Sequence, residues 1–109
     1  MVICHIEAPD EAAHEGSIEK KIAAIEKIDG DVLGRIMEYK DDGLRVLVMP
    51  DHPTPIETQT HDAGPVPFLL WGTGIKGNGA LRFTEKEAGK TGIIVDKGYN
   101  LMNNLVTEG

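Results

Sequence analysis

Hydrophobic residues along this chain fall into several short continuous runs and one long periodic stretch. Residues 2–6 are apolar except at one histidine, which predicts a β-strand. In residues 17–39 apolar side chains recur mostly every three or four positions, the period of an amphipathic helix, and Ser17 is placed to cap its first turn. Residues 44–49 are almost continuously apolar and predict a buried strand. The first half is therefore predicted to be strand, helix, strand.

The second half is predicted to contain shorter elements separated by loops. Prolines and polar residues predict a loop over 51–65, whereas residues 66–71 predict a third strand. Thr84 begins a capping-box sequence that predicts a short helix, and Asp96 is the expected cap of a last helix. Within the glycine-rich residues 72–79, residues 72–77 spell G-x-G-x-x-G after a strand, but a loop continues where that dinucleotide-binding motif requires a helix. A flexible loop is expected there.

The predicted order of the first three elements has a topological consequence. Two strands joined through a helix are almost always parallel with a right-handed crossover, so we expect an α/β fold with a mostly parallel sheet and flanking helices. Both strands then end at the same edge, where ligands of open α/β sheets bind. Side chains that can bind a metal follow these strand ends, and one more lies in the next loop: Asp10, His14, Asp51, His52 and His61.

The spacing within this set favours metal binding. Asp10 and His14 are four residues apart, so a helical turn beginning at Pro9 would place both on one face. Asp51 and His52 are adjacent and would point in different directions, so they could serve different ions. Carboxylates and imidazoles suit Zn²⁺ or Mn²⁺, and five such groups exceed what one open site takes from a protein. Two ions held close together are suited to catalysing phosphoryl transfer. The alternative to metal binding is that these five side chains are solvated surface groups.

Composition narrows the classes of function. A formal net charge of −7 argues against binding to nucleic acid or to an anionic membrane surface. The single cysteine, Cys4, excludes an intrachain disulfide, and its place in an apolar run predicts a buried thiol. Ser17 is the only serine and is expected to be occupied as a helix cap, so no catalytic residue is predicted in this chain. The sequence shows no signal peptide and no membrane-spanning run, which favours a cytoplasmic location.

Several segments together resemble one known family. They are HIEAPDEAAHEG at 5–16, MPDHPTP at 49–55, TH at 60–61, PVPF at 65–68, FTEK at 83–86 and KGYNLM at 97–102. This pattern covers essentially the whole chain and resembles the C-terminal part of cofactor-independent phosphoglycerate mutases of the archaeal type. The resemblance implies membership of the alkaline phosphatase-like superfamily. Residues 1–109 would then form the C-terminal portion of its metal-binding domain, a three-layer sandwich.

The resemblance also implies a chemistry. Two divalent cations, Mn²⁺ or Zn²⁺, would be bound, one by Asp10, His14 and His61 and the other by Asp51 and His52. The complete enzyme would interconvert 3-phosphoglycerate and 2-phosphoglycerate through a phosphoserine, with the nucleophilic serine supplied by an N-terminal part outside this chain. The chain alone is expected to be inactive, and either to self-associate or to need that N-terminal part.

Two alternatives remain open at this stage. One is a related phosphotransferase or phosphatase of the same superfamily, such as the relatives proposed to be homoserine kinases, because the metal ligands would be identical. The other is a metal-binding or assembly domain without catalysis, which the lack of a free serine favours for this chain as it stands.

Overall fold

The computed structural model describes residues 1–40 and 43–106. The chain divides into two compact units, one formed by residues 1–40 and 52–65 and the other by the described residues of 41–51 and 66–109. Both helices and strands are present, in agreement with the α/β class. No helix in the described part of the chain is both long enough and apolar enough to cross a membrane.

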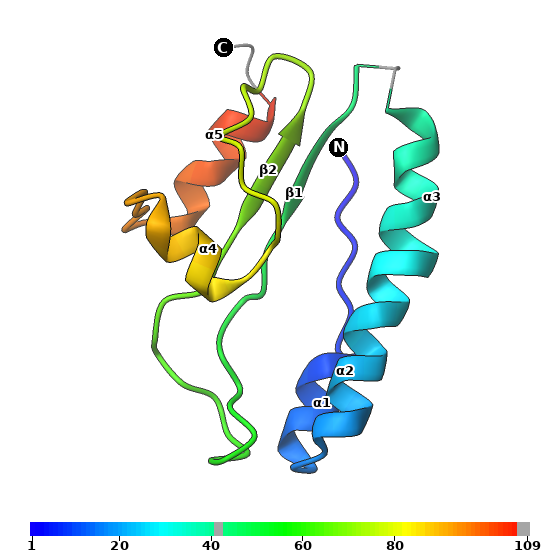
Figure 1. The fold of residues 1–109 in the computed structure, drawn as a ribbon, viewed down its shortest axis with the longest axis vertical. Helices are drawn as coiled ribbons and strands as arrows, with labels where there is room; N and C mark the ends of the chain where they lie inside the picture. Colours follow the sequence, from blue (N-terminus) through cyan, green and yellow to red (C-terminus); the bar gives the residue numbers. More distant parts are fainter. Residues whose placement is uncertain (41–42, 107–109) are drawn as a thin grey trace. The chain divides into compact units, whose positions relative to one another are not determined.

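The first unit is built on two short helices that pack against each other, α1 (Ala8–His14) and α2 (Ile18–Lys27) (Figure 1). A proline in the first turn starts α1, as predicted, because its ring fixes a helical φ and it lacks only an N–H that would be unpaired there. Gly16 ends α1 in a left-handed conformation with φ 72°. The N–H groups of Gly16 and of the next residue then donate to the carbonyls of Ala13 and Ala12, which is a Schellman ending.

The long helix predicted over 17–39 is confirmed. The Ser17 side chain accepts a hydrogen bond from the Lys20 N–H at 3.2 Å, as a cap should. Beyond α2 the chain continues as a π-helical segment η1 (Ile28–Leu33), then α3 (Gly34–Ile36) and a 3₁₀ turn η2 (Met37–Tyr39). Glycines at 30 and 34 lower helix propensity where the turns widen. The predicted helix end at residues 41–42 lies outside the described residues.

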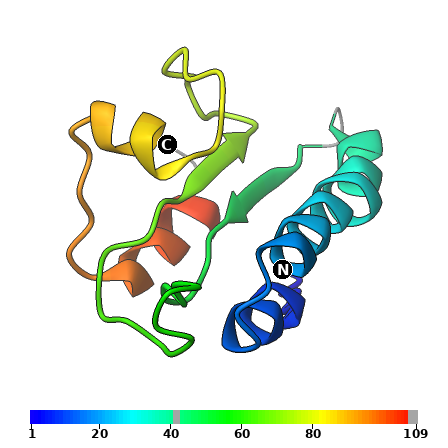
Figure 2. The ribbon, with the colours of Figure 1, turned by 60° about the horizontal axis from the view of Figure 1, so that its bottom comes forward.

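The second unit contains a two-stranded antiparallel sheet, β1 (Arg45–Val48) and β2 (Leu69–Gly72) (Figure 1). Val46 faces Trp71 and Leu47 faces Leu70 in its register. These strands confirm two of the predicted apolar runs, although β1 is half-buried and not fully buried. Helix α5 (Leu101–Val106) contacts β1 (Figure 2), and its Leu101 is buried.

The remaining helices of the second unit are short. Helix α4 (Glu85–Lys90) begins where the capping sequence predicted, with the Thr84 side chain accepting from the Glu87 N–H at 3.1 Å. A 3₁₀ turn η3 (Gly98–Asn100) leads into α5. Lys97 occupies its N-cap position without a side-chain bond, so the predicted cap at Asp96 is wrong. The loop predicted over the glycine-rich stretch is confirmed, because no regular helix follows it before α4.

The strand predicted over residues 2–6 is wrong. This segment has no regular secondary structure, and Val2 and Ile3 are 92% and 77% exposed. A strand needs a neighbour to pair its backbone N–H and C=O groups, and no described segment pairs with this one. The expected parallel strand–helix–strand unit is therefore not formed, and the sheet of the described residues is antiparallel. Cys4 is exposed, so the buried thiol predicted there is also wrong.

Candidate metal site

Three of the predicted ligands lie together in the first unit. Asp10, His14 and His61 each offer one ligand atom, and these atoms all lie within 4.8 Å of one another. Nε2 of His14 is 3.2 Å from Oδ2 of Asp10, and Nε2 of His61 is 3.3 Å from Oδ1 of the same carboxylate. One carboxylate and two imidazoles thus face a common point, a donor set that suits Zn²⁺ or Mn²⁺.

Helix α1 and the loop of residues 52–65 bring these groups together. Asp10 and His14 are one helical turn apart on α1, as their spacing predicted. The loop folds back on itself, because the Asp62 N–H donates to the carbonyl of Pro53 at 3.0 Å. This closure places His61 beside His52, with ring centroids 3.6 Å apart and planes inclined by 31°. We predicted that these side chains would meet at the edge of a parallel sheet. A helix and a loop bring three of them together instead.

Hydrogen bonds to neighbouring groups orient two of these candidate ligands, His14 and Asp10. His14 Nδ1 is 2.7 Å from the carbonyl oxygen of Gln59. Since a carbonyl only accepts, Nδ1 carries a proton and Nε2 is the ring atom turned toward Asp10. The Thr54 hydroxyl donates to Oδ1 of Asp10 at 2.6 Å. Metal-binding histidines and carboxylates are commonly held in this way by outer partners.

The electrostatics favour a charged carboxylate at the centre of this group. The pKa of Asp10 lies below its ordinary value, first because the Thr54 hydroxyl bonds to the ionised form. Partial burial opposes this shift, while His14, His61 and His52 reinforce it. Asp10 therefore stays negatively charged to a lower pH than an isolated aspartate, as a cation ligand should.

The other two predicted ligands, Asp51 and His52, are not part of this three-residue group. His52 lies beside the three-residue group, and its Nδ1 is 3.2 Å from both the Thr54 hydroxyl oxygen and the Pro53 carbonyl oxygen. Both oxygens can accept a hydrogen bond from an Nδ1–H group. Asp51 is exposed and belongs to the second unit. The binding of a second ion by Asp51 and His52 stays a prediction.

Sequence reasoning missed the two groups that orient the ligands, Thr54 and the carbonyl of Gln59. Thr54 stands between two prolines two residues after His52, which was a usable signal for a rigid segment near a ligand. Gln59 has a positive φ of 53°, which is uncommon for a residue other than glycine. Nothing in the sequence around Gln59 indicates that conformation.

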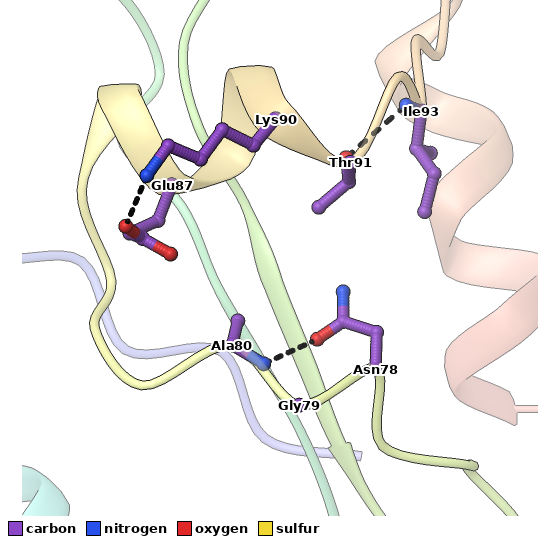
Figure 3. Close-up of a pocket in the computed structure, with 7 residues that line it drawn as sticks. All are labelled: Asn78, Gly79, Ala80, Glu87, Lys90, Thr91 and Ile93. Atoms are coloured by element: carbon purple, nitrogen blue, oxygen red, sulfur yellow. Dashed lines mark hydrogen bonds and ion pairs between the residues drawn. The ribbon is translucent and has the colours of Figure 1, made fainter.

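The second unit has an open surface pocket, shown in Figure 3. Its lining residues are Asn78, Gly79, Ala80, Glu87, Lys90, Thr91 and Ile93. The Lys90 ammonium lies 3.2 Å from the Glu87 carboxylate and forms a partly exposed ion pair with it. The Asn78 side-chain oxygen accepts from the Ala80 N–H at 3.0 Å, which stabilises the loop. This pocket contains none of the predicted ligands and offers no matching set of metal-binding groups.

Comparison with known families defines the class of protein. The chain belongs to the metalloenzyme superfamily, whose family profile matches residues 1–108. The superfamily and the group of Asp10, His14 and His61 together indicate a divalent metal cofactor.

Individual relatives of the chain share one enzyme name, which is narrower than the superfamily. The chain is 44% identical, over 97% of its length, to the 2,3-bisphosphoglycerate-independent phosphoglycerate mutase of Methanothrix thermoacetophila. It is 50% identical over 67% of its length to the enzyme of that name from Methanosarcina mazei, and 50% identical over 74% to mutase 2 of Methanothermobacter thermautotrophicus. The chain spans 28%, 19% and 20% of these relatives' lengths, respectively. No solved structure matches the chain.

Proposed function

We propose that this chain is the C-terminal, metal-binding part of a 2,3-bisphosphoglycerate-independent phosphoglycerate mutase. Such an enzyme interconverts 3-phosphoglycerate and 2-phosphoglycerate through a phosphoserine, and its location would be cytoplasmic. The observation that carries the proposal is the convergence of Asp10, His14 and His61 in a chain whose relatives bear that name. In the complete enzyme the sheet would be extended by parallel strands into the three-layer sandwich of the alkaline phosphatase-like superfamily.

The donor set fits one ion of Zn²⁺ or Mn²⁺ at Asp10, His14 and His61. An ion held by these three residues could also bind an oxygen of the substrate. Asp51 and His52 would contribute to a second ion, completed by ligands from the rest of the enzyme. Bound cations would supply charge stabilisation for the attacking and leaving oxygens of the transferred phosphoryl group.

The side chains of this chain have positioning and binding roles in the proposed reaction. Asp10 supplies a charged oxygen donor, because its lowered pKa keeps the carboxylate ionised to a lower pH than an ordinary aspartate. His14 presents Nε2, since Nδ1 is held by the Gln59 carbonyl. Ser17 is not expected to be the nucleophile, because its oxygen accepts the Lys20 N–H as the cap of α2. The nucleophilic serine is therefore expected from another part of the enzyme.

Complementation tests this proposal. The purified chain should show no turnover of 3-phosphoglycerate with Mn²⁺ or Zn²⁺ added, because it lacks a free serine. Mixing it with the N-terminal portion of the Methanothrix relative should restore mutase activity, and His14→Ala in this chain should abolish that restored activity. Turnover by the chain alone would contradict the assignment of the nucleophile. Failure of every mixture to turn over phosphoglycerate, although the parts associate, would contradict the mutase.

The absence of a free serine also favours a second candidate, a metal-binding or assembly domain without catalysis. Both candidates require the same metal site. Complementation that restores mutase activity is expected for the mutase and not for a non-catalytic domain. A related phosphotransferase would be complemented as well, and would be recognised by turnover of a different phosphorylated substrate.

A further inference from the structure

Thr54 occupies an unusual position for a polar side chain in this chain. It is 6% exposed and is the one buried polar residue among those that the structure describes. Its hydroxyl donates to Oδ1 of Asp10 at 2.6 Å, across 44 residues of sequence. A buried hydroxyl has to be paired, and here the partner is the carboxylate at the centre of the candidate metal site.

The backbone that carries this hydroxyl is held by the protein around Thr54. Pro53 and Pro55 on either side restrict the backbone, because a proline ring fixes its own φ and limits the residue before it. Lys21 of α2 donates from Nζ to the carbonyl oxygen of Thr54 at 2.9 Å and ties the loop to the helix. Thr54 is therefore held by neighbours other than Asp10, so it can orient the carboxylate.

The same loop holds the second ligand of α1. The carbonyl of Gln59 lies 2.7 Å from Nδ1 of His14. The Gln59 N–H donates to the Pro55 carbonyl at 2.9 Å, which fixes the turn that aims this carbonyl. Both ligands of α1 are thus contacted, on their outer side, by residues 52–65.

We propose that Thr54 is a positioning residue of the metal site, which orients Asp10 by its hydroxyl while the Gln59 carbonyl orients His14. This inference rests on the proposed metal-binding function. With both contacts made, Oδ2 of Asp10 and Nε2 of His14 face each other at 3.2 Å, in place to share an ion. Without the hydroxyl, the carboxylate would be free to rotate about its terminal torsion, which is a soft one.

Zn²⁺ binding by the full chain, measured by calorimetry, tests the inference. Loss of an outer partner typically lowers metal affinity by about 10- to 100-fold. Thr54→Val removes the hydroxyl at nearly constant shape, so we expect its Zn²⁺ dissociation constant to rise by about 10-fold or more. Thr54→Ser keeps the hydroxyl and should bind within about threefold of the parent, which a merely structural role of the methyl group would not produce.

Thr58→Val is the matched control in the same loop. Thr58 is exposed, and its hydroxyl reaches the carbonyls of Pro55 and Thr60 at 3.4 Å each, neither of which belongs to a candidate metal ligand. Its loss should leave Zn²⁺ affinity unchanged. Thr54→Ala provides a second deletion of the hydroxyl, and thermal unfolding of each metal-free variant shows whether it is folded.

The outcomes separate the two proposals. Tight binding by the parent and equally tight binding by Thr54→Val would overturn the positioning role but leave the metal site standing. Equal losses in Thr54→Ser and Thr54→Val, or unfolding of both hydroxyl deletions, would assign Thr54 to packing and also overturn the positioning role. No Zn²⁺ binding by a folded parent chain would overturn the metal site and, with it, this inference.

Discussion

The carboxylate of Asp10 is contacted by the imidazoles of His14 and His61 and by the hydroxyl of Thr54. A site organised around one carboxylate should fail when that charge is removed. Because loss of an outer partner costs up to about 100-fold in metal affinity, loss of this ligand should cost at least that much. We therefore expect Asp10→Asn to weaken Zn²⁺ or Mn²⁺ binding by about 100-fold or more, as measured by calorimetry.

Glu57→Gln is the control for Asp10→Asn. It removes the same charge from an exposed position in the loop that carries His61, so it tests whether general electrostatic attraction accounts for binding. Its affinity should stay within about threefold of the parent, because an exposed charge is screened by solvent and salt. Equal losses in the two variants would indicate diffuse attraction of cations instead of ligation by Asp10.

The lowered pKa of Asp10 makes a prediction about acid stability. The group binds its proton less readily in the folded chain than in the unfolded chain, chiefly because of the Thr54 hydroxyl. Its contribution to stability is then complete above the ordinary aspartate pKa and is lost as pH falls through the lowered pKa. Thermal unfolding of the metal-free parent should therefore show a loss of stability in this acidic interval, and Asp10→Asn should lack that component.

An NMR titration measures the same effect directly. The carboxyl carbon of Asp10 should titrate below the ordinary range, and Thr54→Val should move its midpoint upward toward that range, since the first cause of the low pKa is removed. A midpoint that does not move in Thr54→Val would show that the histidines, and not the hydroxyl, dominate the shift.

At the scale of elements, the turn between α1 and α2 supports the site. Gly16 has φ 72°, and a Cβ built there would come 2.9 Å from Nε2 of Gln59. Gly16→Ala should therefore cost about 1–2 kcal/mol for the left-handed conformation, and it would also push against the residue whose carbonyl holds His14. We expect a lower unfolding temperature together with weaker metal binding.

Gly30→Ala is the matched comparison within the same unit. Gly30 lies in the π-helical segment η1 without a positive φ, and nothing lies within 4 Å of a Cβ placed there. Alanine has the higher helix propensity, so this variant should gain up to about 1 kcal/mol, and metal binding should not change. A loss of stability in Gly30→Ala would mean that the π-helical segment η1 depends on glycine.

The elements that could be predicted from the sequence are those determined by local interactions. The helix caps at Ser17 and Thr84 and the proline start of α1 each depend on contacts within a few residues, and all three are found. The strand over 2–6 needed a distant partner, which an apolar run alone cannot specify. Without this strand, the described residues form no parallel strand–helix–strand unit.

Most of the candidate site was nevertheless predictable. Asp10 and His14 lie close together even though none of the described residues before α1 forms a strand, because the proximity of an i, i+4 pair depends only on the helix. His61 comes close to Asp10 because the Asp62 N–H donates to the Pro53 carbonyl and closes the loop. The sequence predicted a loop after a strand but not this hydrogen bond. The left-handed residue Gln59 had no local signal, since such conformations in residues other than glycine are imposed by their surroundings.

On the scale of the whole molecule, very little apolar surface is buried. The buried hydrophobic residues of the described chain are Ala12, Ala13 and Leu101, and no large side chain is fully buried. Large apolar groups such as Leu81 and Ile94 are 92% and 84% exposed. A chain of 109 residues has limited capacity to form a core, so such surfaces are expected to be covered in a functional assembly.

The last prediction follows from this exposure. The two-stranded sheet leaves a strand edge on each side, and unpaired edges and apolar patches promote association. We expect the isolated chain to self-associate, so that light scattering on dilute protein gives a mass well above the 11.8 kDa of the monomer. Addition of the N-terminal portion of the Methanothrix relative should replace these oligomers with a complex of one copy of each part, since in our proposal that portion covers the same surfaces.

Two variants refine the test of association. Leu81→Lys and Ile94→Lys each place a charge on a highly exposed apolar position and should lower the measured mass if these surfaces form the contact. Lys76→Arg changes an exposed residue of the same unit without altering its charge, and should leave the mass as it is. A monomer that unfolds in one cooperative transition would show that the residues buried here are a sufficient core. The exposed surface would then be an ordinary property of a small acidic domain, not a sign of a missing partner.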